Sequence, residues 1–393
     1  MNAEDQAGQV HWSEDGEERS ALWRSGSGAK PPKRVAVADD RMTADAAYKL
    51  ACEGTALLWR GDYHGARQLL AALARRVERK PPKEGATPSE SFHLHRQARS
   101  RRARVLGMLL VPVAFSPEGG YAVPLRRAPE VNEACAEAYG KPAAPHPRLS
   151  LVSLRELQGV LGAHEWRRKG VPLDALGGER VHPHHGVFSP VRGEYVDLVA
   201  HAPLPGGAGG PLVAFDIGTG TGVLAVVLAR RAGVGRVVAT ELGGQALECA
   251  RENVARLGAG GTVEVVRADL FPAPEAGPAD LVVCNPPWLP AKPTSVLEQA
   301  VYDPGSRMLR GFLDGLAARL APGGEGWLIL SDLAEHLELR TRADLLGWIE
   351  DAGLRVADRL DARPLHGRAT DPGAPLHAAR AAETTSLWRL AAA

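Results

Sequence analysis

The chain has 393 residues, of which 45% are hydrophobic and 24% are charged, and its formal net charge is +1. This composition is typical of a globular protein, and the length predicts more than one domain. No apolar run approaches the length of a membrane span, and the balanced charge gives no general attraction to nucleic acid. The four cysteines are scattered without paired spacing, which favours a reducing cytoplasm and disfavours a zinc site.

The N-terminal part is predicted to be a tail followed by an accessory domain. Residues 1–42 are polar and charged without sustained periodicity, so we expect a disordered tail, and their acidic start lacks the apolar stretch of a signal peptide. Residues 43–185 are expected to form a smaller, mostly helical domain. Helices over 44–60 and 66–77 would make an αα-hairpin that resembles one tetratricopeptide unit. No second copy follows, which favours a packed domain over a peptide-binding solenoid.

A basic segment begins at His93, after a linker predicted over residues 80–91. It contains five arginines and no acid: Arg96, Arg99, Arg101, Arg102 and Arg104. Such a cluster can bind the phosphates of a nucleic acid. It can also be the solvated face of a helix, and we favour this interpretation because no aromatic residues are interleaved with the arginines.

A hairpin is predicted over residues 108–115 and 121–126, and helices over 132–139 and 153–168. The histidines between His182 and His185 suggest a metal site. However, no acid or cysteine stands nearby at ligand spacing and a proline interrupts the cluster, so a polar turn is favoured.

A second domain is predicted over residues 186–393. Ser189 is placed to cap a helix, Pro190 suits its first position, and the helix would continue through Val199. The next segment, Val213–Gly222, reads VAFDIGTGTG and predicts a buried strand that enters a glycine-rich ligand-binding turn. A helix over 223–231 follows, and its N-terminus suits the anionic part of a ligand.

Three further strands are predicted to end in polar residues. The strand over 236–240 ends at Glu241, whose carboxylate suits both hydroxyls of a ribose. The strand over 263–267 is followed by Asp269, and the strand over 280–284 runs into Asn285-Pro286-Pro287-Trp288. Ligands of open α/β sheets bind at such carboxyl ends of strands.

The remaining elements alternate again between helix and strand. A helix is predicted from Tyr302 to Leu309, a strand over 327–330 and a helix over 333–352. The last two strands are predicted over 354–360 and 384–390, and a loop containing Arg363, Arg368 and Arg380 separates them. These arginines can meet an acidic substrate or simply solvate the loop, and we favour the second interpretation.

The order of DIGTGTG, Glu241, Asp269 and NPPW resembles class I S-adenosylmethionine-dependent methyltransferases. Within them it resembles the amino-methyltransferases with an Asn/Asp-Pro-Pro-aromatic motif, most closely the HemK-type protein-glutamine N5-methyltransferases. The resemblance covers Gly186 to Leu390. It departs from the family at Trp288, where Tyr or Phe is usual, and the region before Gly186 matches no recognition domain.

The resemblance implies an α/β fold with a Rossmann-like seven-stranded sheet and helices on both faces, whose last two strands form an antiparallel hairpin. It also implies S-adenosyl-L-methionine as the cofactor. The expected cofactor-binding residues are Asp216, Gly218, Thr219, Gly220, Gly222, Glu241, Asp269, Leu270 and Asn285, and the expected catalytic residues are Asn285, Pro286 and Trp288. Phe188, Pro190 and Glu194 would line the site or belong to a structural lid.

The chemistry expected at NPPW is methylation of a planar amide or amino nitrogen, whose lone pair is delocalised. The side-chain oxygen of Asn285 and the carbonyl of Pro286 would engage the two hydrogens of that nitrogen, and Trp288 would stack on the acceptor. A protein glutamine or similar amide is favoured as substrate. A nucleic-acid amino group, a small amide or amine, an inactive cofactor-binding scaffold and an NAD-dependent oxidoreductase remain alternatives. We expect residues up to His185 to select the substrate, and the sequence assigns no oligomeric state.

Overall fold

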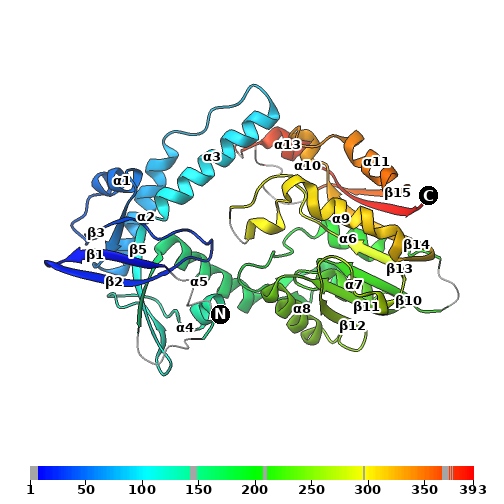
Figure 1. The fold of residues 1–393 in the computed structure, drawn as a ribbon, viewed down its shortest axis with the longest axis horizontal. Helices are drawn as coiled ribbons and strands as arrows, with labels where there is room; N and C mark the ends of the chain where they lie inside the picture. The colour runs from blue at the N-terminus through cyan, green and yellow to red at the C-terminus, as the bar shows by residue number, and fades with distance from the viewer. Residues whose placement is uncertain are drawn as a thin grey trace. The chain divides into compact units, whose positions relative to one another are not determined.

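The computed structural model describes residues 8–141, 148–206, 210–294, 297–364, 371, 373 and 375–393. The chain divides into two compact units (Figure 1). The first unit comprises Met1–Glu84 and His93–Glu165, and the second comprises Gly85–Phe92 and Trp166–Ala393. Each unit has its own buried apolar cores.

The first unit is built on a mixed seven-stranded sheet with the order β1-β2-β7-β5-β4-β3, and β6 pairs with β5. The strands are β1 Gln9–Glu14, β2 Glu17–Arg24, β3 Arg34–Ala38, β4 Thr55–Trp59, β5 Leu109–Ser116, β6 Gly120–Ala122 and β7 Arg148–Ser153. The helices are α1 Ala44–Cys52, α2 Tyr63–Glu78, α3 Pro88–Leu106, α4 Asn132–Tyr139 and α5 Leu154–Lys169. Residues 88–92 of α3 and 166–169 of α5 belong to the second unit. The expectation of a helical domain with one hairpin did not foresee this seven-stranded sheet.

Three strands occupy the segment that was expected to be a disordered tail. Val10 and Trp12 on β1, together with Ala21 and Trp23 on β2, form a buried cluster against one side of the sheet. Their spacing of two residues is the period of a half-buried strand, whose outward positions are polar. Residues 8–42 therefore belong to the fold of the first unit.

The predicted αα-hairpin is also wrong. Helix α1 ends at Cys52, and Gly54 adopts a φ of 81°, which turns the chain into β4. The apolar run of β4 is buried between β3 and β5, both of which pair with it in parallel. The linker prediction also extends too far, because α3 begins at Pro88. The β5–β6 hairpin and helix α4 are confirmed.

The second unit contains a seven-stranded sheet with the order β12-β11-β10-β13-β14-β16-β15. The strands are β10 Leu212–Ile217, β11 Val234–Glu241, β12 Val263–Arg267, β13 Ala279–Cys284, β14 Leu320–Ser331, β15 Leu354–Ala362 and β16 Thr385–Ala392. The first five pair in parallel, whereas β16 runs antiparallel to both β14 and β15. This confirms the predicted Rossmann-like sheet with its final antiparallel hairpin. A small hairpin of β8 Val171–Pro172 and β9 Arg180–Val181 precedes the sheet.

Helices cover both faces of this sheet because successive strand residues point to opposite sides. Ala214 of β10 packs in one core with helices α6 and α7, whereas its neighbour Phe215 packs in another with α9 and α11. The helices are α6 Glu194–His201, α7 Val223–Ala229, α8 Gly244–Arg256, α9 Arg307–Leu316, α10 Leu333–His336, α11 Arg342–Asp351 and α13 His377–Ala382. Within the described ranges, no helix combines the length and apolar character that a membrane crossing requires.

Three helix predictions need correction. Helix α6 begins at Glu194, so Ser189 does not cap it and Pro190 precedes it. Helix α9 begins at Arg307 rather than at Tyr302. The helix predicted over 333–352 is two helices, because Thr341 and Asp344 form a capping box that begins α11 anew.

Candidate functional site

The strand order brings the carboxyl ends of three predicted strands to one edge of the second unit's sheet. Strand β10 lies between β11 and β13 and pairs in parallel with each. The glycine turn follows β10, Glu241 ends β11 and Asn285 follows β13. The three predicted parts of the site are thus contributed by neighbouring strands, as the sequence order predicts.

The turn after β10 requires glycine for two different reasons. At Gly222, with a φ of 81°, a Cβ atom would lie 3.3 Å from the backbone of Ala250, so this position permits close packing against α8. At Gly220, with a φ of 57°, a Cβ atom would meet nothing within 4 Å. Gly220 therefore exposes its backbone to open space, where a ligand can approach.

The side chain of Asp216 is hydrogen-bonded to the glycine turn. Its side chain is buried, and its Oδ2 atom accepts a hydrogen bond from Thr219 Oγ1 at 2.5 Å. Burial raises the pKa of Asp216 to about 6, with a smaller contribution from the negative charge of Glu241, and the Thr219 hydroxyl opposes the rise. The contacts of Asp216 thus fix the turn.

Glu241 joins the turn to the end of β11. Its Oε2 atom accepts the Gly220 N–H at 3.1 Å, and its Oε1 atom accepts the N–H groups of Leu242 at 2.9 Å and Gly243 at 3.0 Å. A carboxylate offers about four acceptor positions. Three backbone donors therefore leave about one position free, and accepting two ribose hydroxyls at once requires one of these donors to give way.

Asp269 and Leu270 follow β12. The Asp269 side chain is 60% exposed and lies 3.5 Å from the Arg307 guanidinium. Leu270 adopts a φ of 67°, which is unusual for a residue with a Cβ atom, and its carbonyl accepts the Thr240 hydroxyl at 2.6 Å. Thr240 was not predicted as a site residue, although its position directly before Glu241 is a usable signal.

The NPPW segment is held by its own side chains. The indole Nε1 of Trp288 donates to Asn285 Oδ1 at 2.9 Å, and Pro286 is buried. Immediately after the motif, Leu289 forms a bridge with Tyr302. These contacts fix the orientation of the Asn285 amide, with its oxygen toward the indole.

An ion pair that no sequence motif marks lies against the Trp288 ring. The Arg192 guanidinium lies 5.1 Å from the centre of the Trp288 ring, and its two terminal nitrogens donate to Glu383 at 3.0 Å each. Glu383 is 2% exposed and also accepts the Ser331 hydroxyl at 2.7 Å. The Glu194 carboxylate lies 3.3 Å from Arg192 Nε, and burial raises the pKa of Glu194.

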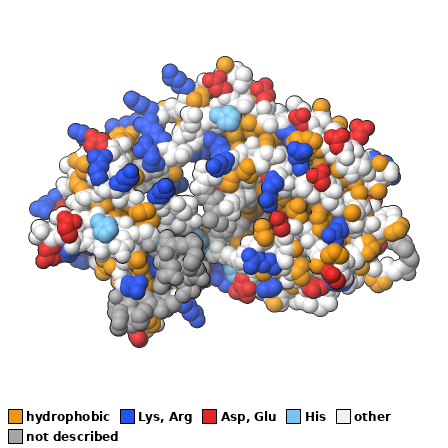
Figure 2. All heavy atoms as spheres, viewed as in Figure 1, with side chains coloured by type: hydrophobic (Ala, Val, Ile, Leu, Met, Phe, Trp, Pro, Cys, Tyr) orange, Lys and Arg blue, Asp and Glu red, His pale blue; other side chains and the backbone are white. Residues whose placement is uncertain are grey.

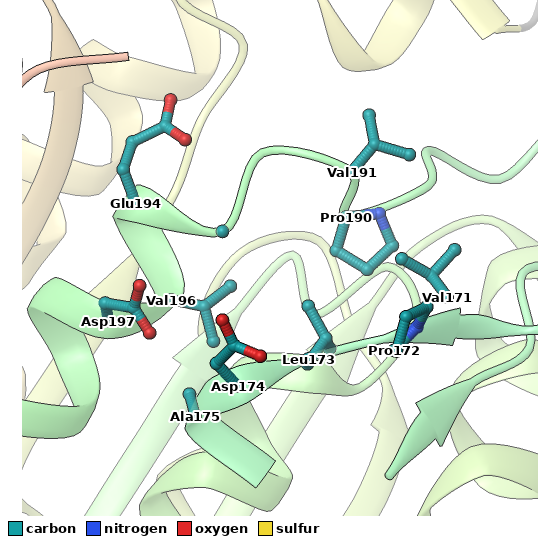
Figure 3. Close-up of a pocket in the computed structure, with 11 residues that line it drawn as sticks. Val171, Pro172, Leu173, Asp174, Ala175, Pro190, Val191, Glu194, Val196 and Asp197 are labelled. Atoms are coloured by element: carbon teal, nitrogen blue, oxygen red, sulfur yellow. The ribbon is translucent and has the colours of Figure 1, made fainter. Parts of the chain in front are cut away.

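A separate pocket of about 290 Å³ lies beside the segment that was expected to line the site (Figure 3). Pro190 and Glu194 contribute to its lining, but the carboxylate of Glu194 points away from the other labelled side chains. The lining residues include none of the glycine turn, Glu241 or NPPW. Phe188 is half-buried and does not line this pocket.

The predicted polar turn around His182 has protein partners. The Nδ1 atom of His182 lies 2.6 Å from the Arg167 carbonyl, and Nε2 of His184 lies 2.9 Å from Glu252 Oε2. Asn253 donates to the carbonyls of His182 and Thr221, which ties this turn to the glycine turn. The described residues hold no group of three or more His, Cys, Asp or Glu suited to a metal ion.

Residues 180–336 match the methyltransferase small domain family. The matched region contains the glycine turn, Glu241 and NPPW, and it confirms the resemblance seen in the sequence. Among curated proteins, the chain is 31% identical over 170 residues to the release factor glutamine methyltransferase of Chlorobaculum tepidum, covering 39% of this chain and 58% of the relative. It is 38% identical over 146 residues to the ribosomal protein L11 methyltransferase of Pelotomaculum thermopropionicum, covering 37% of this chain and 39% of the relative.

Both alignments leave a large part of each relative unmatched. Among solved structures, a methyltransferase from Pyrococcus furiosus is similar, with a TM-score of 0.37 and 19% identity over 60% of this chain and 98% of that chain. The residues that match the family model, 180–336, lie within the second unit.

Proposed function

We propose that this chain transfers a methyl group from S-adenosylmethionine to a planar amide nitrogen, and that this amide is a glutamine side chain of a protein. The observation that carries the proposal is the placement of Asn285 Oδ1 at the end of β13, one strand from the glycine turn. The name of the glutamine methyltransferase relative supports the choice of substrate class.

The residues of the turn fit such a cofactor. The charged end of the cofactor would bind at the turn, because the backbone at Gly220 faces open space. The turn residues proposed for this contact are Gly218, Thr219, Gly220 and Gly222. Glu241 would accept a ribose hydroxyl, and Asp216 would support the turn. Asp269, Leu270 and Asn285 would complete the binding site. When bound, the cofactor supplies an electrophilic methyl group.

Asn285 acts by orientation. The Oδ1 atom has two lone pairs, so it can accept an N–H of the substrate while the Trp288 indole occupies the other lone pair. The carbonyl of Pro286 would accept the second N–H. Both hydrogens are then engaged, which directs the nitrogen lone pair toward the methyl group. Transfer would leave S-adenosylhomocysteine, and the methylated nitrogen would lose its extra proton to solvent, because neutral Asn285 is a poor base.

Trp288 would present one face to the substrate. The Arg192 guanidinium already lies over the ring at 5.1 Å, and its pair with buried Glu383 holds it there. A planar amide stacked on the opposite face would complete the contact. Arg192 and Glu383 are therefore proposed as residues that position Trp288.

We further propose that residues up to His185 select the substrate, which is a protein or small amide or amine. Of the three arginines between β15 and β16, Arg363 directly follows β15, Arg380 lies on α13, and Arg368 lies outside the described residues. The nucleic-acid alternative depends on the arginines from Arg96 to Arg104.

Titration calorimetry with S-adenosylhomocysteine and with NAD tests the cofactor assignment. We expect the chain to bind S-adenosylhomocysteine and not NAD. Binding of NAD alone would show that the glycine turn serves an oxidoreductase instead. A chain that binds S-adenosylhomocysteine but transfers no methyl group to any fraction of a cell extract would be the inactive scaffold.

A further inference from the structure

A strongly cationic face lies on the first unit and shares no residue with the proposed methyl-transfer site. Between residues 75 and 104 the chain has ten lysines and arginines but three glutamates. The ten cations are Arg75, Arg76, Arg79, Lys80, Lys83, Arg96, Arg99, Arg101, Arg102 and Arg104. This stretch therefore has a large excess of positive charge, whereas the formal net charge of the whole chain is +1.

Two helices contribute to this cationic face. Arg102 Nε of α3 donates to Glu78 Oε1 of α2 at 2.9 Å, and Val77 and Val105 share a buried cluster. The C-terminal part of α2 therefore lies beside α3. Exposed cations come from both helices and from the residues just after α2: Arg75, Arg79, Lys80, Lys83, Arg99, Arg101 and Arg104. Figure 2 shows basic side chains gathered over the region where Figure 1 places α2 and α3.

Nearby acids do not neutralise the face. Glu78 is already paired with Arg102, and Glu90 accepts the backbone N–H of Ala86 at 2.6 Å. Asp45 pairs with Arg76 at 2.7 Å. Even when Asp45 and all three glutamates are counted, the ten cations leave an excess of positive charge. The potentials of charges of one sign that lie on one surface add.

We propose that this face binds the phosphate backbone of a double-stranded nucleic acid. The sequence alone favoured a solvated helix face, but it could not show that cations from α2 join those of α3. Most of the ten cations are arginines, whose planar forks suit phosphate oxygens. The arginines of α3 from Arg96 to Arg104 extend over about 12 Å, enough to meet several phosphates.

The face lacks what other partners require. Among the described residues, the exposed large hydrophobic side chains are Val37, Trp166, Val191, Leu242, Leu346 and Val356, and none belongs to α2 or α3. A protein interface would therefore lack apolar anchors, and a membrane surface would receive no inserted side chain. Single strands prefer exposed aromatic rings for stacking, which these helices do not offer.

The test uses the full chain and fluorescein-labelled RNA and DNA duplexes of 20 base pairs, with anisotropy measured over a series of KCl concentrations. The first variant combines Arg79→Gln, Arg101→Gln and Arg104→Gln, and a second variant combines Arg79→Gln and Lys80→Gln on the α2 side alone. The matched control combines Arg251→Gln, Arg256→Gln and Arg355→Gln, three exposed arginines of the second unit. Thermal unfolding verifies that each variant is folded.

We expect the wild type to bind with a strong salt dependence. The triple variant should bind the duplexes about tenfold more weakly at 0.1 M KCl. The slope of log K against log salt concentration should become less steep by about one for each lost phosphate contact. The control should bind like the wild type. Binding of either duplex supports the proposal, and the comparison of RNA with DNA identifies which one is preferred.

Several outcomes would overturn the proposal. The first is that the wild type binds no duplex at 50 mM KCl, and the second is that the triple variant and the control lose equal duplex affinity. The third is that a single strand, polyglutamate or phosphatidylserine vesicles bind more tightly than the duplexes. Polyglutamate binding would indicate an acidic protein as partner, and vesicle binding would indicate a membrane surface. Methyl transfer plays no part in this measurement.

Discussion

Trp288 donates its indole N–H to Asn285 Oδ1 at 2.9 Å, and a phenylalanine at this position would keep an aromatic face but lose the donor. We expect Trp288→Phe to lower kcat by up to about tenfold, the scale of one hydrogen bond, with KM for the substrate and cofactor affinity nearly unchanged. Steady-state kinetics with Trp166→Phe as control checks this, because Trp166 is exposed. An unchanged kcat would mean that the indole does not orient the Asn285 amide.

Glu241 joins three backbone N–H groups and has about one remaining acceptor position. We expect Glu241→Ala to weaken S-adenosylhomocysteine binding by about 1 to 3 kcal/mol, because a charged acceptor is lost. Titration calorimetry measures the effect, and Glu264→Ala on the exposed side of β12 serves as the control. If the two variants bind equally well, Glu241 does not contact the cofactor.

Asp216 should make stability depend on pH. Its pKa is raised to about 6 by burial, so its protonated form is favoured in the folded state. Its contribution to stability is therefore fully present below the unfolded pKa of about 4 and is lost as pH rises through 6. The loss is on the order of 3 kcal/mol.

We expect Asp216→Asn, which can still accept the Thr219 hydroxyl, to gain stability relative to the wild type as pH rises from 4 to 7. Urea unfolding at several pH values measures this difference. A constant difference between the two proteins over that range would contradict the assigned pKa shift.

At the scale of elements, burial on both faces explains which strands were predictable. Strands β10 and β13 are apolar runs in the middle of the sheet, and each begins within one residue of its predicted start. The edge strand β12 also has its predicted bounds, although Val263 is its only buried residue. In contrast, β1 and β2 bury only alternate residues, and their charged outward positions resemble a disordered segment. The β4 run was assigned to a helix because its partners on either side come from distant parts of the sequence.

The first two strands should contribute measurable stability. Trp12 is 4% exposed in the cluster that β1 and β2 form. We expect Trp12→Ala to destabilise the first unit by about 3 to 5 kcal/mol, because it leaves a cavity. Hydrogen exchange of the β1 and β2 amides, compared with Arg19→Ala on the exposed side of β2, checks this result. Unprotected amides in the wild type would restore the disordered-tail interpretation.

At the scale of the whole molecule, the order of the motifs along the chain predicted the fold of the second unit but not that of the first. The glycine turn, the acids Glu241 and Asp269, and NPPW each follow or end a strand. They converge because the strands run parallel in one sheet. The pair of Arg192 and Glu383 joins positions far apart in sequence, and no local pattern marks it. The cationic face likewise required the packing of α2 against α3.

The central claim is that Asn285 positions a protein amide for methyl transfer. The most direct measurement incubates a cell extract with tritiated S-adenosylmethionine and either the wild type or Asn285→Ala, followed by digestion with protease or nuclease. We predict wild-type label that protease releases and nuclease does not. Label should be lower by roughly 100-fold in the variant, a loss much larger than any loss of its affinity for S-adenosylhomocysteine. Equal labelling by both proteins, or label released by nuclease alone, would contradict the account.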